Sequence, residues 1–499
     1  MRKSGILLPI FSLPNSYGIG TLGKEAYQFV DFLVKSHQSY WQVLPLGPTS
    51  YGDSPYQSFS VFAGNPYFID FDLLSEDGLL GKSDYNHCLD ESLTIDYEKI
   101  YFSRFEVLRK AYKKFDIETI KEFEKENSDW LNDYAIFMAL KELHNGVSFL
   151  EWDKKYQIRD KKALQDFVKD NLEEINFWKF LQYEFYKQWN ELRTYANLHG
   201  IKIIGDMPIY TALDSSDVWS HPELFQLDKN LKPKMVAGCP ADDFTPLGQL
   251  WGNPLYNYSA MKKDNYKWWV RRVEVSAKLF DTIRIDHFRG FEAYFAIPAG
   301  DENALGGQWK KGPNVKLFNA IKKNLGDIDI IAENLGFITK EVDIMLEKLG
   351  YPGMKILQFA FDPKNDSEHA PHNLTYNTVV YTGTHDNPPV RSWYESLGEV
   401  EKEYFHEYLH FDSPYEIVNE MVRTALSSVC YLAVIPLYDY LQKGDEARIN
   451  TPSKLGGNWT WRMSKGDMNK DLSAYIAKLT DTYKRYQAEE KESEEEIEE

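Results

Sequence analysis

The sequence predicts an α/β fold, a (β/α)8 TIM barrel with long, mainly helical insertions. Three observations predict it: the chain contains eight short apolar runs, helical segments separate several of them, and the pattern extends over about 400 of the 499 residues. Continuous runs rich in Ile, Val and Leu are typical of strands buried on both faces of a parallel sheet. Eight such strands alternating with helices are the pattern of a barrel. A doubly wound open sheet stays the alternative, because a count of strands does not prove closure.

The expected strands follow one another along the chain. The first four are YWQVLPL (40–46), NPYFIDF (65–71), IKIIGDMPIY (201–210) and TIRIDHF (282–288). The last four are IDIIAENLG (328–336), MKILQFAF (354–361), VVYTGTHDN (379–387) and CYLAVIPLYDY (430–440). Segments 263–280 and 339–350 lie between several of them and have helical character.

The remaining segments complete the expected organisation. Residues 1–485 are expected to form a single catalytic barrel unit. Within it, residues 100–195 are charged and aromatic with little strand character, which predicts a helical insertion between the second and third strands. Residues 237–254 contain three glycines and form a candidate lid loop. Residues 486–499 form an acidic tail, which is expected to stay solvated or to extend a terminal helix.

The charge and the aromatic content restrict the class of partner. A formal net charge of −19 disfavours nucleic acid, polyphosphates and anionic membranes. Aromatic residues make up 15% of the chain, with 33 Tyr and 13 Trp. Their rings stack on the apolar faces of pyranose sugars, although many of them are expected simply to fill the core. A neutral substrate is therefore favoured.

Cysteine usage and the N-terminus indicate a reducing, intracellular compartment. Cys88, Cys239 and Cys430 lie far apart and match no disulfide framework, C-x-x-C pair or zinc spacing. The run MRKSGILLPIF superficially suggests a signal peptide, but Pro9 interrupts it and no small-residue cleavage site follows. No stretch approaches the length of a membrane span. We therefore expect a cytoplasmic protein with no membrane partner.

Two motifs are rejected on their context. GIGTLG (18–23) matches the dinucleotide fingerprint, but Pro14 and turn residues precede it where a buried strand is needed. His369 and His372 have H-x-x-H spacing, but they lie in a polar stretch with no third ligand at a helical offset. Neither a nucleotide cofactor nor a metal is expected.

Three acids end predicted strands, where barrel enzymes hold their catalytic groups. Arg284 and Asp286 are two residues apart, so both project to one side of a strand, and the arginine favours an ionised aspartate. Glu333 closes the run IDIIA, and Asp386 follows His385 at the end of VVYTGTH. Each acid alone has an alternative explanation as a strand-end cap or ion pair. Three in order favour a reaction that needs several carboxylates.

Glycoside cleavage is such a reaction. A retaining enzyme attacks the anomeric carbon with one ionised carboxylate and protonates the leaving oxygen with a second carboxyl group. A third acid can hold sugar hydroxyls as the ring distorts toward the transition state.

Several longer strings carry a resemblance to a known family. They are YWQVLPLGP (40–48), GDSPYQSFSVFAGNP (52–66), GDMPIY (205–210), DSSDVW (214–219), GQLWGNP (248–254), RIDHFRG (284–290), AENLG (332–336) and THDNPP (384–389). The chain up to about residue 485 resembles the amylomaltases, or disproportionating enzymes, of glycoside hydrolase family 77. This resemblance implies a 4-α-glucanotransferase that needs no cofactor, acts on maltooligosaccharides and other α-1,4-glucans, and accepts glucose.

The resemblance also implies roles for individual residues. Asp286 matches the nucleophile, Glu333 the acid/base and Asp386 the residue that stabilises the transition state. The positions that match glucan-contacting residues are Ser54, Tyr56, Asp206, Asp242, Trp251, Arg284 and His385. Tyr51 resembles part of a second, surface glucan site.

Three other functions are weighed against transfer. An α-glucan hydrolase of the same barrel type uses the same acids, so local chemistry does not separate it from a transferase. A non-catalytic glucan-binding protein predicts a missing acid, whereas all three are present. A barrel that acts on sugar phosphates is disfavoured by the net charge and by the lack of a glycine-rich phosphate loop.

Overall fold

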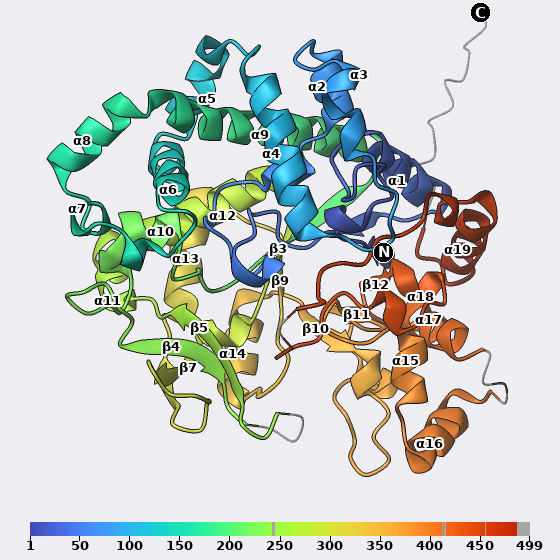
Figure 1. Cartoon of the computed structure of the whole chain (residues 1–499). Helices are drawn as coiled ribbons and strands as arrows, with labels where there is room; N and C mark the ends of the chain where they lie inside the picture. The colour runs from blue at the N-terminus through green and yellow to red at the C-terminus, as the bar shows by residue number, and fades with distance from the viewer. Residues whose placement is uncertain (242–244, 412, 414–415, 455, 487–499) are drawn as a thin grey trace, which may run out of the picture.

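A closed barrel of eight parallel strands forms the centre of the computed structural model, which confirms the predicted fold class (Figure 1). The structure describes residues 1–241, 245–411, 413, 416–454 and 456–486. Around the barrel the strand order is β1-β12-β11-β10-β9-β6-β3-β2. The strands are β1 (Lys3–Leu7), β2 (Tyr40–Gln42), β3 (Lys202–Met207), β6 (Thr282–Ile285), β9 (Ile330–Ala332), β10 (Gly353–Ile356), β11 (Thr378–Tyr381) and β12 (Leu432–Pro436).

One predicted strand is wrong. The run 65–71 forms the 3-10 helix η3 (Pro66–Phe68) and the start of α2 (Phe71–Glu76). Asn65 accepts a hydrogen bond from the backbone N–H of Tyr67, and the Asp70 carboxylate accepts bonds from two N–H groups at the start of α2. These side-chain caps satisfy the free amides of a helix start, so the apolar run turns into helices.

The eighth barrel strand is instead β1, within the N-terminal run that superficially suggests a signal peptide. It pairs in parallel with β12 on one side and with β2 on the other, so it closes the barrel. A Cβ atom at Gly5 would lie 2.7 Å from the Cβ atom of Tyr40. Glycine at this position therefore allows β1 and β2 to approach each other.

Helices surround the barrel and form most of the rest of the molecule (Figure 1). Those outside the segment between β2 and β3 are α1 (Lys24–Lys35), α10 (Ser216–Ser220), α11 (Tyr258–Met261), α12 (Lys267–Leu279), α13 (Val315–Leu325), α14 (Lys340–Leu349), α15 (Val390–Glu395), α16 (Glu399–Leu409), α17 (Ile417–Ser427), α18 (Leu437–Tyr440) and α19 (Lys470–Thr482). No helix in the described ranges combines the length and the apolar character needed to cross a membrane.

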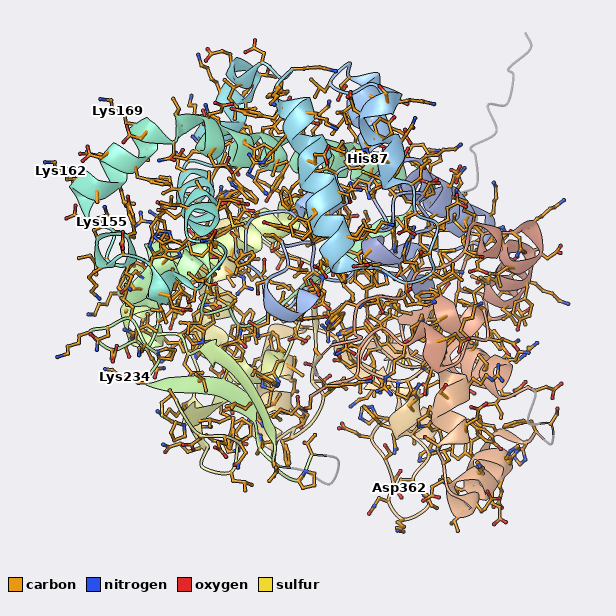
Figure 2. All side chains as sticks on the ribbon, in the orientation of Figure 1. His87, Lys155, Lys162, Lys169, Lys234 and Asp362 are labelled. Carbon is orange, nitrogen blue, oxygen red and sulfur yellow. The ribbon has the colours of Figure 1, made fainter. Side chains whose placement is uncertain are left out.

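The segment between β2 and β3 is mainly helical. Besides α2 it contains α3 (Lys82–Tyr85), α4 (Tyr97–Tyr112), α5 (Lys121–Glu126), α6 (Leu131–Leu143), α7 (Lys154–Gln157), α8 (Lys161–Asp170) and α9 (Leu172–Leu198). The Arg109 guanidinium on α4 binds both carboxylate oxygens of Glu174 on α9, at 2.7 and 2.8 Å. Lys155, Lys162 and Lys169 lie along α7 and α8 at one outer edge of the molecule (Figure 2).

A second, four-stranded sheet lies beside the barrel, in the order β5-β4-β7-β8 (Figure 1). Its strands are β4 (Met235–Cys239), β5 (Gln249–Pro254), β7 (Ala293–Pro298) and β8 (Gln308–Lys311), and all pairs are antiparallel. Both ends of the segment 237–254, expected as a lid loop, therefore lie in β4 and β5, which pair as a β-hairpin. Phe295 on β7 pairs with Gly238 on β4 and with Trp309 on β8. Paired residues share a face, so these three belong to one face of the sheet.

The end of the described chain is fastened to its beginning. The fully buried Arg485 guanidinium donates to five backbone carbonyl oxygens at 2.6–3.2 Å. These carbonyls belong to Lys3, Ala425, Leu426, Ser428 and Cys430. Because Lys3 begins β1 and Cys430 precedes β12, Arg485 holds together the two strands that close the barrel.

Candidate active site

The three predicted acids lie at the same end of the barrel. Asp286 follows β6 directly, Glu333 follows β9 directly, and Asp386 follows β11 after four residues. All barrel strands are parallel, so these positions lie at the carboxyl end of the barrel, where barrel enzymes place their active sites. Strands β6 and β9 are paired, with Ile285 opposite Ala332, and this register brings Asp286 and Glu333 to adjacent positions.

A buried arginine connects two of the strand-end carboxylates. The Nη1 atom of Arg284 donates to both oxygens of Asp206 at 2.6 Å and to Oδ1 of Asp286 at 3.2 Å. The Tyr56 hydroxyl donates to the other side of the network, to Asp206 Oδ2 at 2.8 Å. Burial alone lowers the pKa of Arg284, but Asp206 and Asp286 outweigh it, so the pKa is raised and the cation is maintained.

Asp286 and Glu333 share a buried, negatively charged environment. Burial raises the pKa of Asp286 well above its ordinary value; Arg284 opposes this shift, and Asp206, Glu333 and Asp386 add to it. Burial also raises the pKa of Glu333, and Arg284 is again the largest opposing influence. Like charges so close together do not ionise independently. The two carboxyl groups therefore keep a proton between them to a higher pH than free carboxyl groups do.

Backbone amides hold the Glu333 carboxylate in place. Its Oε2 atom accepts from the N–H of His287 at 2.6 Å, and its Oε1 atom accepts from the N–H of Leu335 at 2.8 Å. His287 has a left-handed backbone conformation, with φ 45° and ψ 46°, which is uncommon for a residue other than glycine. Such strained positions cluster at functional sites, and here the conformation directs an N–H group at Glu333.

His287 is a site residue that the sequence reasoning missed. Its ring is buried, and burial followed by the nearby Arg289 lowers the pKa of His287 to about 3. The imidazole is therefore neutral at physiological pH. The only signal in the sequence was its position immediately after Asp286, because its contact with Glu333 uses the backbone and leaves no side-chain pattern.

Asp386 has a different environment from the other two acids. Its side chain is 44% exposed, compared with 27% for Asp286. Its Oδ1 atom accepts a hydrogen bond from Asn450 Nδ2 at 2.6 Å and lies 3.4 Å from Nε2 of His385. His385 is buried, and burial lowers its pKa against the opposing influence of Asp386. Asn450 was not predicted, because the contact joins residues 64 positions apart.

Aromatic rings line the site next to these acids. The Tyr56 ring stacks on the His385 ring with centroids 5.2 Å apart, and Trp459 lies 5.8 Å from Tyr56. Trp251 on β5 makes an edge contact of 4.8 Å with the ring of His287. The hydroxyl of Ser54 accepts a bond from the N–H of Tyr56 at 3.3 Å, so Ser54 shapes the turn that carries the tyrosine.

The structure thus brings together most of the predicted site residues. Joined directly or through one neighbour are Ser54, Tyr56, Asp206, Trp251, Arg284, Asp286, Glu333, His385 and Asp386. Two predicted positions are not placed: Asp242 and the side chain of Tyr51 lie outside the part of the chain that the structure describes.

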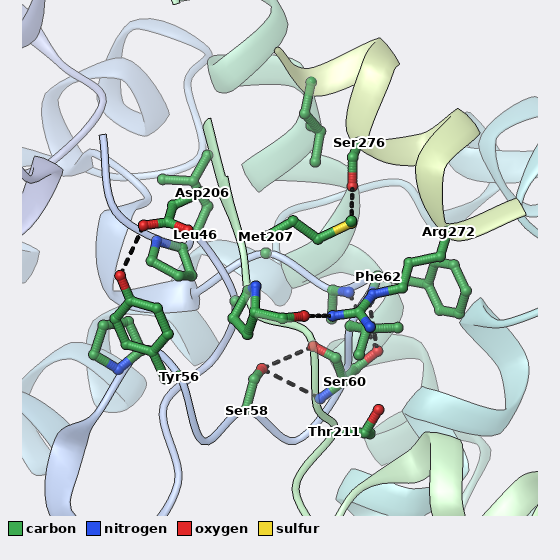
Figure 3. A pocket seen from close by; sticks show the side chains of 18 of the residues that line it. Leu46, Tyr56, Ser58, Ser60, Phe62, Asp206, Met207, Thr211, Arg272 and Ser276 are labelled. Atoms are coloured by element: carbon green, nitrogen blue, oxygen red, sulfur yellow. Dashed lines mark hydrogen bonds between the residues drawn. The ribbon is translucent and has the colours of Figure 1, made fainter. Parts of the chain in front are cut away.

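A small cavity lies next to Tyr56 and Asp206, and Figure 3 shows it with Arg272 at its far side. Its volume is about 60 Å³, whereas ligand pockets begin at roughly 300 Å³. The cavity has room for about two water molecules and not for a sugar. The exposed parts of Asp286 and Asp386, and not this cavity, are therefore open to a sugar.

The two histidines of the rejected metal motif contact other groups of the protein. His369 accepts a bond from the N–H of Ile356 at 3.1 Å, and His372 contacts the Tyr408 hydroxyl and the Asp366 carboxylate at 2.7 and 3.0 Å. Over the described ranges no group of three or more His, Cys, Asp or Glu side chains is arranged to hold a metal ion.

Comparisons with known proteins agree with this geometry. A family model described as 4-alpha-glucanotransferase matches residues 8–469. The chain is 48% identical to a 4-alpha-glucanotransferase of Streptococcus pneumoniae, with 97% of each protein covered, and 42% identical to one of Thermus thermophilus, covering 97% and 99%. Its structure superimposes on the amylomaltase of Streptococcus agalactiae in complex with acarbose with a TM-score of 0.95, at 43% identity and covering 98% and 100%.

Proposed function

The chain belongs to the 4-alpha-glucanotransferase family, glycoside hydrolase family 77, and we propose that it transfers α-1,4-glucan segments through a covalent intermediate on Asp286. The observation that carries this assignment of residues is the pairing of Asp286 and Glu333 at one end of the barrel. One of the two contacts a fixed cation, and the other is oriented by two backbone amides.

In the first step, Asp286 attacks the anomeric carbon of the donor sugar. Arg284 lies 3.2 Å from Asp286 and favours its ionised form. The reaction needs the proton of the pair on Glu333 when the donor sugar is bound. As the bond from carbon to the aspartate oxygen forms, the glycosidic bond breaks and Glu333 protonates the departing oxygen. The products are a glycosyl-aspartate ester and a shortened glucan with a free 4-hydroxyl group.

In the second step, the 4-hydroxyl of glucose or of another glucan replaces the aspartate. Glu333, now ionised, takes the hydroxyl proton while the acceptor oxygen bonds to the anomeric carbon and the ester bond breaks. Two inversions at one carbon retain the α configuration. The enzyme returns to its starting protonation state, with the proton again on Glu333.

The remaining polar residues bind the sugar at the reaction centre. Asp386 is the most exposed of the three acids and is fixed by Asn450 and His385, so it suits the hydroxyl groups of the sugar that distorts during attack. Tyr56 and Arg284 keep Asp206 in place between them. We propose that these groups bind maltooligosaccharides as donors.

The hairpin of β4 and β5 is proposed to act as a lid over the acceptor. After Asp286 is glycosylated, transfer needs a bound acceptor and restricted access of water. Trp251 on this hairpin packs against His287, the residue that follows the nucleophile. In the Trp251→Ala variant we expect transfer to fall more than hydrolysis, measured as reducing ends released per transfer event. An equal loss of both would assign Trp251 a structural role only.

The setting of the enzyme is also part of the proposal. Residues 1–485 are proposed as one catalytic unit, supported by the contacts that join Arg485 to both closing strands. A reducing, cytoplasmic compartment is supported by the low cysteine content, three residues in a chain of 499.

Incubation with maltotriose tests the function. A transferase converts it to glucose and longer oligomers, a hydrolase yields glucose and maltose, and a binding protein leaves it unchanged. The Asp286→Asn variant serves as the control for any contaminating activity.

A further inference from the structure

Trp309 is an exposed aromatic residue on the second sheet, outside the network of acids. It lies on β8, which ends the sheet order β5-β4-β7-β8, and 40% of it is exposed. Its strand neighbour on the same face, Lys311, carries a largely exposed ammonium group that binds Glu292 at 2.5 Å. A tryptophan side chain combines a large apolar face with a polar N–H group, which suits it to binding sites that remain partly exposed to water.

Two side chains fix the orientation of the Trp309 ring. The Arg289 guanidinium lies over one face of the ring, 3.7 Å from its centroid. The Phe295 ring makes an edge contact with centroids 5.1 Å apart. Since Arg289 is itself buried, that face of the tryptophan is covered, and the exposed part of the ring includes the opposite face.

Arg289 also connects this ring to both catalytic loops. It lies three residues after Asp286 in the chain, on η9 (Phe288–Phe291). Its Nη1 atom donates to the backbone carbonyl of Phe337, which lies four residues after Glu333. Phe337 is 42% exposed. The buried Arg289 guanidinium therefore contacts the Trp309 ring and the backbone of the loop that follows Glu333.

We propose that Trp309 forms an outlying subsite for an α-glucan, with the open face of its ring stacked on a pyranose ring. The flat ring is held rigidly, so little side-chain entropy is lost on binding, and the Lys311 ammonium is placed to donate to sugar hydroxyls. Arg289 lies between the Trp309 ring and the backbone of the loop after Glu333, so we expect only glucans longer than the reacting units to reach this subsite. This proposal rests on the function proposed above and adds a determinant of chain length to it.

The test compares short and long substrates. For Trp309→Ala we expect the KM for maltoheptaose to rise roughly five-fold, the magnitude of one aromatic stacking contact, with kcat within two-fold and maltotriose kinetics unchanged. Trp309→Phe keeps a flat ring and is expected to retain most of the affinity. Tyr376→Ala is the matched control, because Tyr376 is 57% exposed but precedes β11 and so lies at the opposite end of the barrel.

If the Trp309→Ala variant does not fold, the Trp309→Leu variant tests the same proposal. Leucine covers Arg289 but offers no flat ring, so it should lose affinity for maltoheptaose as alanine does. Equal changes for maltotriose and maltoheptaose, no change for either, or full affinity in the leucine variant would overturn the proposal. Failure of the proposed function itself looks different, because the wild-type protein would then leave maltotriose unconverted or cleave it to glucose and maltose only.

Discussion

At the scale of single residues, the chemistry depends on which carboxyl group holds the proton that Asp286 and Glu333 keep between them. Arg284 lies next to Asp286, whereas two amide N–H groups bind Glu333. The site thus places a fixed positive charge next to the nucleophile, whereas the two N–H groups orient Glu333 and lower its pKa against the larger effect of burial. An aspartate that attacks carbon needs that charge before the sugar arrives.

The nucleophile is tested by trapping. A 2-deoxy-2-fluoroglucosyl donor with a good leaving group slows the second step, so the ester on the enzyme accumulates. We expect mass spectrometry of peptides to find the label on Asp286, and Asp286→Asn to lose more than about 1,000-fold in kcat with an unchanged melting temperature. A label on Glu333 or Asp386 would contradict the assignment.

The acid is tested by the pH profile. The pKa of Glu333 is raised, and its protonated form is the active one, so activity should be lost as the pH rises through this pKa. The glutamine of Glu333→Gln cannot ionise. This variant should therefore lose the alkaline decline of the pH profile together with most of the rate on maltooligosaccharides. A glucosyl fluoride donor, whose leaving group needs no proton, should restore the first step. If the variant keeps both the alkaline decline and the rate, Glu333 is not the acid.

At the scale of elements, buried side chains fix the loops that carry the acids. Asp439 on α18 is buried and accepts from the Thr382 hydroxyl at 2.6 Å and from the Val390 N–H at 2.9 Å. These two contacts hold both ends of the segment that contains His385 and Asp386. The loop after β11 is therefore positioned by a carboxyl group that does not face the substrate.

Two substitutions of Asp439 separate its effect on stability at different pH values from its role in anchoring the loop after β11. Burial raises its pKa to about 7 against the two hydrogen bonds, so its folded form binds a proton that the unfolded chain releases near pH 4. Its contribution to stability is thus present at low pH and is lost as the pH rises toward 7. Asp439→Asn should keep kcat and remove this decline in melting temperature. Asp439→Ala should lower stability by about 2 kcal/mol and lower kcat, because two donors lose their acceptor.

The asparagine variant is also the control for the alanine variant. It can accept from the Val390 N–H and donate to the Thr382 hydroxyl, so it preserves both anchors without a charge. An alanine variant with full kcat would show that the loop around Asp386 does not depend on Asp439.

The barrel strands that end in acids were predictable from the sequence, whereas β1, β5 and the helices at 65–71 were not. Acids that end apolar runs stand out because buried parallel strands have few polar residues. Strand β1 has no such signal, since KSGIL is short and contains Ser4 and Gly5. The strand character of QLWGNP is hidden by Gly252 and Pro254, which are unfavourable in strands. The strand predicted for residues 65–71 is wrong because the capping side chains in this run, and not its apolar residues, determine the local structure.

The site residues divide in the same way. Arg284 and Asp286 are two apart on one strand, so their contact follows from the period of the strand. Asn450 reaches Asp386 only because the barrel brings β11 and β12 together, and no local spacing reveals that contact.

At the scale of the whole molecule, Arg485 holds the closing strands of the barrel together from outside. Arg485→Ala should lower the free energy of unfolding by roughly 3 kcal/mol or more, because several buried carbonyls lose their donor. Removal of residues 487–499 breaks none of these contacts and should leave the melting temperature unchanged. Thermal unfolding of both variants tests this, and equal stability of Arg485→Ala and wild type would contradict it.

The pairing of β1 with β12 has a consequence for the order of folding. Ile6 pairs with Trp41 on one side and with Ile435 on the other, so the second partner of β1 is made only about 430 residues later. At ~5–20 residues per second, this delay is roughly 20–90 seconds of synthesis on the ribosome. Throughout that time β1 presents an unpaired edge, a hazard for aggregation. Chaperone capacity during translation, more than the stability of the finished barrel, is therefore expected to limit the yield of active protein.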